Sequence, residues 1–294
     1  MPEKGKVDLH IHSTASSDGQ HSPREIFEMA GKIGLRAIAF ADHNSVGSID
    51  EGLKLSKEYG IEFIPCFELN TLYDDMDIHM LAYYVDHRER ALHSWLAEIH
   101  EAKYCQAEKR LKALKAIDFD IDQRDLDSFA GGRAPSGATF LSALLSKEAG
   151  KKDPKLQPYI DGKRSDSPSL NFYLDYFRKG KPAFVPLDIC PIETGIKKIR
   201  EFGGVPVQAH PSDTGDKNII KFIELGMMGL EAYSSYHDAA ASAHFCKLAK
   251  EHGILHTAGS DFHGKKIKPN VELGDVDGNS YEIVERLKDA RKKI

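Results

Sequence analysis

The chain has 294 residues, of which 41% are apolar, with a formal net charge of −5 and a pI near 6.3. Its length suits an α/β barrel, and its acidic balance argues against a broadly basic surface for nucleic acids. No charged-then-apolar leader opens the chain, no apolar run could span a bilayer, and the four cysteines form no C-x-x-C pair. We therefore expect a cytoplasmic protein that contacts no membrane and has no disulfide framework.

The first predicted strand, residues 7–11, leads into two imidazoles that point the same way. Strand side chains alternate between faces, so His10 and His12 can bind one metal ion together, and Asp18 returns to the same mouth from the following loop. Roughly 0.7 such His-x-His pairs are expected by chance in a chain with this many histidines. The pair therefore needs support from other segments.

Helices and strands then alternate along the chain. A capping box, Ser22-Pro23-Arg24-Glu25, opens the first helix with proline at its first position. Apolar periodicity and glycine stops predict a helix from residue 23 to Gly34, a strand over 35–41, a helix over 49–59, a strand over 61–67 and a strand over 78–85. This alternation predicts a parallel sheet wrapped by helices, with ligands at the carboxyl ends of the strands.

Beyond residue 85 the pattern becomes helical and polar. Asp86-His87-Arg88-Glu89 is a second capping box, which is predicted to open a long helix that runs to about residue 116. After it we expect a loop at 131–133, a helix ended by Gly150, a polar surface excursion over 151–169 and a short helix over 170–178. Residues 86–181 are therefore predicted to form a helical insert that covers the active-site mouth, and residues 1–85 and 182–294 the barrel.

The alternation then resumes. The predicted elements are a strand over 183–185, a helix over 192–202, a strand over 205–209, a helix over 217–225, a strand over 230–233, a helix ending at 252, a strand over 254–258 and a helix over 282–292.

Nine polar residues stand at or beside the strand ends. They are His10, His12, Asp18, His43, Glu68, His79, His210, Asp261 and His263. Imidazole and carboxylate ligands without thiolate suit zinc, manganese or iron. Nine ligands exceed what one ion needs, so we expect two or three divalent ions that share a bridging carboxylate.

The motifs that contain these residues resemble the signature set of the PHP (polymerase and histidinol phosphatase) family, in family order. They are DLHIHSTASSDG, ADHN, FELNT, DIHMLAY, QAHP and GSDFHG. KPAFVP and GLEAYSSYH add to the similarity with one branch, the RNase AM-like phosphoesterases that act on nucleotide 3′,5′-bisphosphates and short RNA 5′ ends. The resemblance implies a distorted (β/α)7 barrel with a helical insert.

The resemblance also implies three metal positions. His10, His12, Glu68 and Asp261 would hold the first ion. Glu68 would bridge to a second ion held by His79 and His210, and Asp18, His43 and His263 would hold a third. Other members often have a histidine where Asp18 stands, which leaves the metal preference of the third position open.

In the mechanism that the resemblance implies, the bound ions would supply a bridging hydroxide to attack the phosphate, and the leaving oxygen would need a proton. By resemblance His237 is the candidate acid and also contacts substrate, whereas Asp261 could instead carry the proton while it binds metal. Arg133 and Lys181 match basic positions of the branch and would bind the remaining phosphate. After Arg133 the chain reads Ala134-Pro135-Ser136-Gly137, without the Pro-His and the second arginine of the branch, which leaves the preference for a bisphosphate open.

We therefore expect a metal-dependent phosphoesterase that releases phosphate from a small phosphorylated substrate, a nucleotide or a short single-stranded RNA end. Two other hypotheses stay open: a histidinol-phosphatase-like monoesterase and a non-catalytic metal-binding PHP module. Phosphate release from adenosine 3′,5′-bisphosphate but not from histidinol phosphate would separate the first two.

Overall fold

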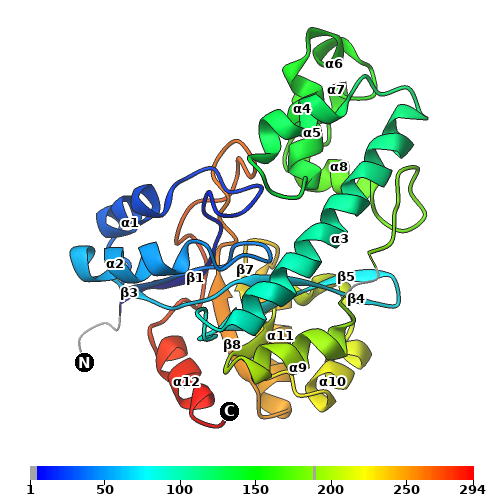
Figure 1. Cartoon of the computed structure of the whole chain (residues 1–294). Coiled ribbons are helices and arrows are strands. Elements are labelled where there is room, and N and C mark those ends of the chain that lie inside the picture. Colours follow the sequence, from blue (N-terminus) through cyan, green and yellow to red (C-terminus); the bar gives the residue numbers. More distant parts are fainter. Residues whose placement is uncertain (1–4, 188–189) are drawn as a thin grey trace.

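The computed structural model describes residues 5–187 and 190–294, and two sheets form the core of its barrel (Figure 1). The first sheet is parallel, with the strand order β1-β2-β3, and the second has the order β4-β5-β6-β7-β8. The strands are β1 (Val7–Ile11), β2 (Ala37–Phe40), β3 (Glu62–Phe63), β4 (Glu68–Tyr73), β5 (Met76–Tyr83), β6 (Val205–Gln208), β7 (Gly229–Ser234) and β8 (Leu255–Gly259).

Backbone hydrogen bonds join the two sheets at both edges. On one side, the amide of His12 donates to the carbonyl of Phe262 at 2.8 Å, just beyond β1 and β8. On the other side, His43 pairs with Glu68, and the amide of Asn44 donates to the Glu68 carbonyl at 2.7 Å. The result is a distorted α/β barrel, which confirms the predicted fold class.

Amphipathic helices cover the outside of this barrel (Figure 1). They are α1 (Pro23–Lys32), α2 (Ile49–Tyr59), α9 (Ile192–Glu201), α10 (Asp216–Glu224), α11 (Ala239–Glu251) and α12 (Glu282–Arg291). The predicted capping box of α1 is confirmed, because Ser22 Oγ accepts from the amide of Glu25 while Glu25 Oε2 accepts from the amide of Ser22. In the described part of the chain, no helix has both the length and the apolar content to cross a membrane.

The predicted all-parallel order is wrong in the middle of the barrel. β4 and β5 form an antiparallel hairpin through Asp74 and Asp75, which both have positive φ, and β5 also runs antiparallel to β6. The strand predicted over 61–67 shrinks to β3, since Pro65 has no N–H for a ladder, and Glu68 begins a strand where it was expected to end one. Glu68 still reaches the rim because the hairpin starts there.

A further strand was predicted over 183–185 and does not form. Ala183 is fully buried, and its amide donates to the carbonyl of Tyr176 at 2.9 Å. Ala183 therefore belongs to the apolar cluster of the helical region beside the barrel.

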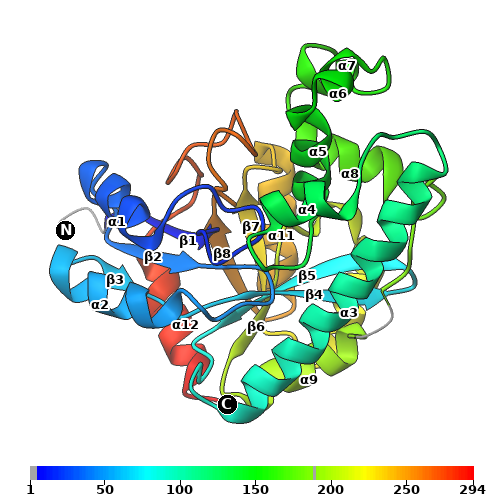
Figure 2. The same cartoon turned by 45° about the horizontal axis from the view of Figure 1, so that its top comes forward.

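Helices α3 to α8 occupy the predicted insert (Figure 2). They are α3 (Arg90–Lys115), α4 (Gln123–Ala130), α5 (Gly137–Ser146), α6 (Glu148–Lys152), α7 (Gln157–Ile160) and α8 (Pro168–Tyr176). The second predicted capping box does not form, because α3 begins at Arg90 and Glu89 caps it alone. Gly150 lies within α6 and ends no helix. A Cβ there would stand 1.9 Å from the Leu144 carbonyl oxygen, so glycine permits this close approach.

The long helix α3 connects two separate apolar cores (Figure 1). Its first half packs on the barrel core through Leu92, Leu96 and Ile99. Its second half packs, through residues such as Leu111, into a cluster formed with α4, α5, α7 and α8. The polar stretch 151–169 contributes buried Leu156 and Tyr159 to this cluster, so it is more than a surface excursion. One continuous helix therefore fixes the helical region against the barrel.

Candidate metal centre and substrate cavity

Four side chains from separate segments meet at one point of the rim. Nε2 of His10 lies 3.2 Å from Nε2 of His12, 3.5 Å from Glu68 Oε2 and 3.3 Å from Asp261 Oδ1. Nε2 of His12 lies 3.3 Å from the same Glu68 oxygen and 3.2 Å from the same Asp261 oxygen. All four side chains are buried.

These separations test whether the residues fit a metal ion. Zinc at its usual 2.0–2.1 Å from four nitrogen or oxygen ligands needs those ligands about 3.4 Å apart in a tetrahedron. The observed separations of 3.2–3.5 Å match that requirement. The chemistry of the donors agrees, since imidazole and carboxylate together suit zinc, manganese and iron.

Glu68 is the centre of a second group. Its Oε1 lies 3.0 Å from His79 Nδ1 and 3.2 Å from His210 Nε2, and its Oε2 lies 3.0 Å from His43 Nδ1. One buried carboxylate therefore faces imidazoles on both of its oxygens, the arrangement that a bridging ligand requires.

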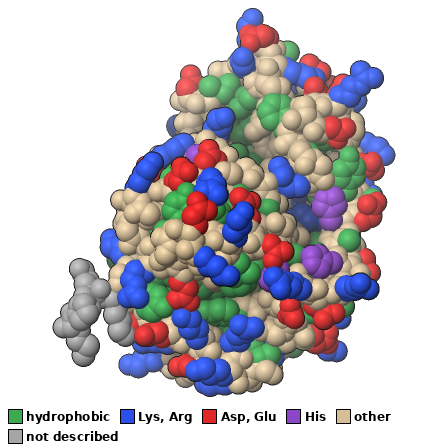
Figure 3. Space-filling view, turned by 60° about the vertical axis from the view of Figure 1, so that its left-hand side comes forward, with side chains coloured by type: hydrophobic (Ala, Val, Ile, Leu, Met, Phe, Trp, Pro, Cys, Tyr) green, Lys and Arg blue, Asp and Glu red, His purple; other side chains and the backbone are tan. Residues whose placement is uncertain are grey.

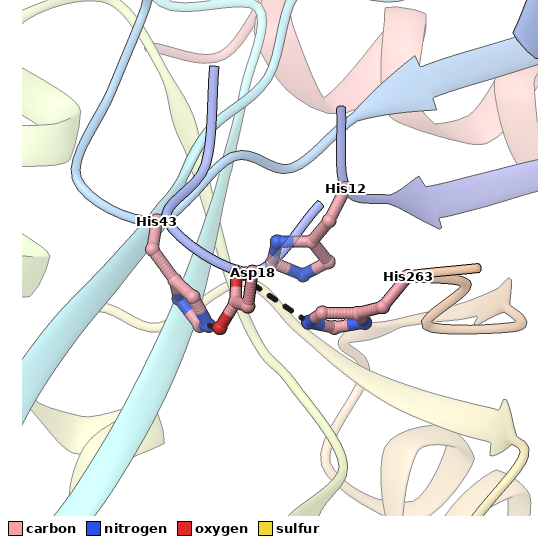
Figure 4. Close-up of side chains that lie close together, drawn as sticks. All are labelled: His12, Asp18, His43 and His263. Carbon is pink, nitrogen blue, oxygen red and sulfur yellow. Dashed lines mark ion pairs between the residues drawn. The ribbon is translucent and has the colours of Figure 1, made fainter. Parts of the chain in front are cut away.

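Asp18 forms a third group with two of the histidines (Figure 4). Its Oδ2 lies 3.6 Å from His43 Nε2, and its Oδ1 lies 3.8 Å from His263 Nε2. His12 stacks on His263 with ring centroids 3.9 Å apart, so this group adjoins the first. All nine sequence-predicted metal ligands therefore lie at one rim of the barrel.

Left-handed backbone turns aim several of these side chains. His210 and Asp261 have φ of 28° and 56°, and Asn44, next to His43, has φ of 50°. Such conformations cost roughly 1–3 kcal/mol in residues other than glycine and persist where surrounding structure enforces them. Their concentration here marks the rim as a functional site.

Glu231 on β7 is a functional residue that the sequence reading missed. It is fully buried, its Oε1 lies 2.9 Å from His10 Nδ1, and its Oε2 accepts from the amide of His210 at 3.0 Å. This contact fixes the tautomer of His10 so that Nε2 faces the centre. The sequence does contain a hint of this role, because a carboxylate in the mostly apolar strand GLEAYS is unusual.

The charge of this centre depends on protonated imidazoles. Burial alone would lower the pKa of His12, but its hydrogen bonds to Asp261 and Glu68 raise it to about 9. Burial would raise the pKa of Glu68, but His79, His43 and His10 hold it well below its usual range. The carboxylates therefore require nearby positive charge, which a divalent cation supplies when it displaces these protons.

Lys268 lies beside Asp261 Oδ2, whereas His10 and His12 lie beside Oδ1, and Tyr236 contacts both Lys268 and the His210 ring. The Lys268 ammonium pairs with Asp261 Oδ2 and donates to the Tyr236 hydroxyl at 2.6 Å. Burial would raise the pKa of Asp261, but Lys268, His10 and His263 hold it well below its usual range. The sequence reading missed both neighbours, because nothing near GSDFHG marks Lys268 as close to the site.

A cavity of about 750 Å³ opens between this rim and the helical region. The space-filling view shows the hollow between the two parts, with histidine and basic side chains beside it (Figure 3). Arg133 lines it, and its Nη1 donates to the Thr14 carbonyl at 2.6 Å, in the loop after β1. Lys181 is exposed and lies outside the residues that line the cavity.

His237 also lies outside the cavity lining. Its Nδ1 is 2.9 Å from the Ala232 carbonyl, and its ring packs against Phe245 at 4.9 Å. Burial lowers its pKa. The geometry brings neither His237 nor Lys181 to the centre, so their proposed roles stay untested predictions.

A model of the PHP domain matches residues 8–147. A 5′-3′ exoribonuclease of Haemophilus influenzae is 29% identical over 264 residues, which cover 88% of this chain and 90% of its own length. The matched segment of this chain is a PHP domain. The chain is a hydrolase, a metal-dependent phosphoesterase.

Two further relatives of this chain are named for two different activities. A phosphoribosyl 1,2-cyclic phosphate 1,2-diphosphodiesterase of Eggerthella lenta is 25% identical over 263 residues, covering 88% of this chain and 94% of its own length. A 3′,5′-nucleoside bisphosphate phosphatase of Chromobacterium violaceum is 26% identical over 267 residues, covering 87% of each chain.

A solved structure resembles the whole fold. An amidohydrolase from Chromobacterium violaceum, determined with bound sulfate and no metal, has a TM-score of 0.80 and 25% identity, and covers 97% of this chain and 96% of its own. The similarity extends through the helical region as well as the barrel.

Proposed function

We propose that this chain hydrolyses a phosphomonoester of a small nucleotide substrate, either a 3′,5′-bisphosphate or the 5′ end of a short RNA. The observation that carries the proposal is the approach of both imidazoles, His10 and His12, to Glu68 and Asp261 at 3.2–3.5 Å, beside a cavity that the two carboxylates line. Relatives named as a nucleoside bisphosphate phosphatase and as an exoribonuclease support this choice of substrate.

In this proposal the nine rim residues hold two or three divalent ions, of manganese, iron or zinc. His10, His12, Glu68 and Asp261 hold one, Glu68 with His79 and His210 another, and Asp18, His43 and His263 a third. When bound, the ions would lower the pKa of a water molecule and neutralise charge on the phosphate oxygens.

The residues of the chain prepare the reaction in three ways. Glu231 and Ser16 engage the Nδ1 atoms of His10 and His12, which keeps both Nε2 atoms toward the centre. The helical region covers the cavity, which shields the reacting phosphate from bulk water. Asp261 lines the cavity beside the centre, and it remains our candidate for moving a proton to the leaving oxygen.

Arg133 is proposed to contact the substrate from the helical side. It lines the cavity, and its Nε is buried without a hydrogen-bond partner, while Nη1 is engaged by the loop after β1. A planar guanidinium suits phosphate oxygens. The four free cysteines, one of them exposed, agree with a reducing cytoplasmic location, which we keep as part of the proposal.

A substrate panel tests the proposal. The full chain, loaded with manganese, is assayed for phosphate release from adenosine 3′,5′-bisphosphate, a 5′-phosphorylated RNA oligonucleotide, histidinol phosphate and a phosphoribosyl 1,2-cyclic phosphate. We expect the first two to be hydrolysed with the highest kcat/KM. Preference for histidinol phosphate or for the cyclic ester would replace our substrate, and no turnover with zinc, iron or manganese would favour a non-catalytic module.

A further inference from the structure

Helix α3 presents a row of polar side chains to the cavity. Lys103, Gln106 and Arg110 all line it, and their spacing of three and then four residues places them on one helical face. Lys103 and Arg110 stand about 10.5 Å apart along the helix axis. Because α3 runs outward from the barrel into the helical region, this row leads away from the rim (Figure 1).

Arg110 has no partner that accounts for its charge. Only 8% of the residue is exposed, and its Nε is buried without a hydrogen-bond partner. Asp77 is the carboxylate that acts on its charge, but among the described residues no carboxylate forms an ion pair with Arg110 within 4.0 Å. The guanidinium lies 4.7 Å from the Phe177 ring centroid and 5.9 Å from that of Tyr173. Buried arginines are normally paired, since desolvating an unpaired charge is costly.

Lys103 is the second cation of this row that lacks a carboxylate. Its Nζ donates to Asn70 Oδ1 at 2.8 Å, and the Asn70 amide in turn contacts His79 Nε2 at 2.7 Å. Lys103 therefore stands next to the proposed metal centre. Asp77, at the cavity edge, is held by the Tyr173 hydroxyl.

Three other cations of the cavity wall are paired with carboxylates, and Arg133 is held by the Thr14 carbonyl. Lys179 contacts Asp75 at 2.6 Å, Arg178 contacts Asp213 at 3.3 Å, and Lys268 pairs with Asp261. This difference separates Lys103 and Arg110 from the surrounding surface charges. Asp77 is the carboxylate that acts on both of these cations, and it forms an ion pair with neither. A wall with two such cations, one of them beside aromatic rings, is suited to an anionic ligand.

We propose that Arg110, assisted by Lys103, binds the second anionic group of the substrate, a phosphate that is not cleaved. The proposal rests on the proposed function, since it assumes that the other phosphate lies at the metal centre. According to this proposal, residues of α3 cause the enzyme to prefer substrates with a second phosphate. This helix is separate from the loop that carries Arg133.

Kinetics of Arg110→Met test this assignment, because methionine keeps an unbranched apolar stem without the charge. On adenosine 3′,5′-bisphosphate we expect KM to rise about 10- to 100-fold, as for a lost charge-assisted hydrogen bond. On the monophosphate that carries only the cleaved phosphate, KM and kcat should change less than threefold. Arg110→Lys should recover part of the loss. Equal losses on both substrates would overturn the proposal.

Lys179→Met is the matched control, since Lys179 also lines the cavity but is paired with Asp75. Its KM for the bisphosphate should stay within twofold of wild type, and a loss as large as that of Arg110→Met would overturn the proposal.

Thermal unfolding of the same full-length proteins gives a readout that needs no turnover. In metal-free buffer, adenosine 3′,5′-bisphosphate should raise the Tm of wild type and raise that of Arg110→Met much less. Without ligand, the Tm of Arg110→Met should equal or exceed that of wild type, because an unpaired buried charge is removed. A lower Tm would assign Arg110 a structural role. If wild type hydrolyses none of the panel but keeps this ligand response, the proposed reaction fails and the anion site stands.

Discussion

On the barrel side of the cavity, carboxylates and imidazoles satisfy one another, whereas on the α3 side two cations lack any carboxylate partner. At the rim, Glu68 and Asp261 each face several histidines at 3.0–3.5 Å. On α3, the Arg110 guanidinium lies beside two aromatic rings and forms no ion pair with a carboxylate of the described residues. The rim is therefore prepared to hold cations and α3 to hold an anion, and a doubly phosphorylated substrate would use both.

Removing a rim ligand should have the largest effect. Asp261→Asn keeps the shape of the side chain but loses the charge that faces His10 and His12, so we expect phosphate release to fall more than about 1,000-fold. Far-UV circular dichroism should stay unchanged. His244→Ala is the control, since His244 is exposed and pairs with Asp216 away from the rim, and it should keep full activity. Activity of Asp261→Asn within tenfold of wild type would remove Asp261 from the centre.

The two sides should respond to pH in opposite directions. The pKa of His12 is raised to about 9, so protons compete with metal, and apparent metal affinity should rise about tenfold per pH unit for each displaced proton up to about pH 9. Burial lowers the pKa of Lys103 to about 8, so this cation is lost above that pH. KM for adenosine 3′,5′-bisphosphate should therefore rise above pH 8, at saturating metal.

The predicted change in metal affinity is checked by isothermal titration with manganese at pH 7, 8 and 9. The predicted change in KM is checked by steady-state kinetics over the same pH range. A metal affinity that does not change with pH would contradict the raised pKa of His12. A KM that falls above pH 8 would contradict the part assigned to Lys103.

Glu231→Gln should weaken metal binding about 10- to 100-fold, since partners that orient metal-binding histidines typically have effects of that size. The amide keeps the hydrogen bond to the His210 amide but no longer favours one tautomer of His10. The metal concentration that gives half-maximal activity measures this loss. Saturating metal should restore most of kcat, whereas a defect that metal cannot restore would make Glu231 part of the reaction itself.

The smallest effect is expected for Arg133→Met. One guanidinium nitrogen already donates to the Thr14 carbonyl, so less of the group is free for substrate than at Arg110. We expect KM for the bisphosphate to rise about three- to tenfold. A rise larger than that of Arg110→Met would move the main anion contact from α3 to the loop after α4.

The sequence could predict the rim because its residues follow local patterns. His10 and His12 are two apart on a strand, and Asp42-His43-Asn44 follows a buried strand, so one-dimensional spacing places them. Glu68 was placed correctly for a partly wrong reason, since it begins the β4–β5 hairpin. The hairpin escaped prediction because both of its strands lie next to other apolar runs.

Contacts between distant segments could not be predicted. Glu231 meets His10 across 221 positions, and Arg110 meets Phe177 only because α8 folds back on α3. On a polar helix, Lys103 and Arg110 are indistinguishable in sequence from solvated charges. In three dimensions they differ from Lys179 because they are less exposed and form no ion pair with a carboxylate of the described residues.

The most direct test of metal-dependent phosphomonoester hydrolysis is phosphate release from adenosine 3′,5′-bisphosphate before and after metal exchange. Protein stripped with a chelator should release no phosphate, and titration with manganese should restore turnover at two to three equivalents per chain. Full turnover by the stripped protein would contradict the account. So would a metal-loaded protein that binds manganese and leaves every phosphomonoester of the panel intact.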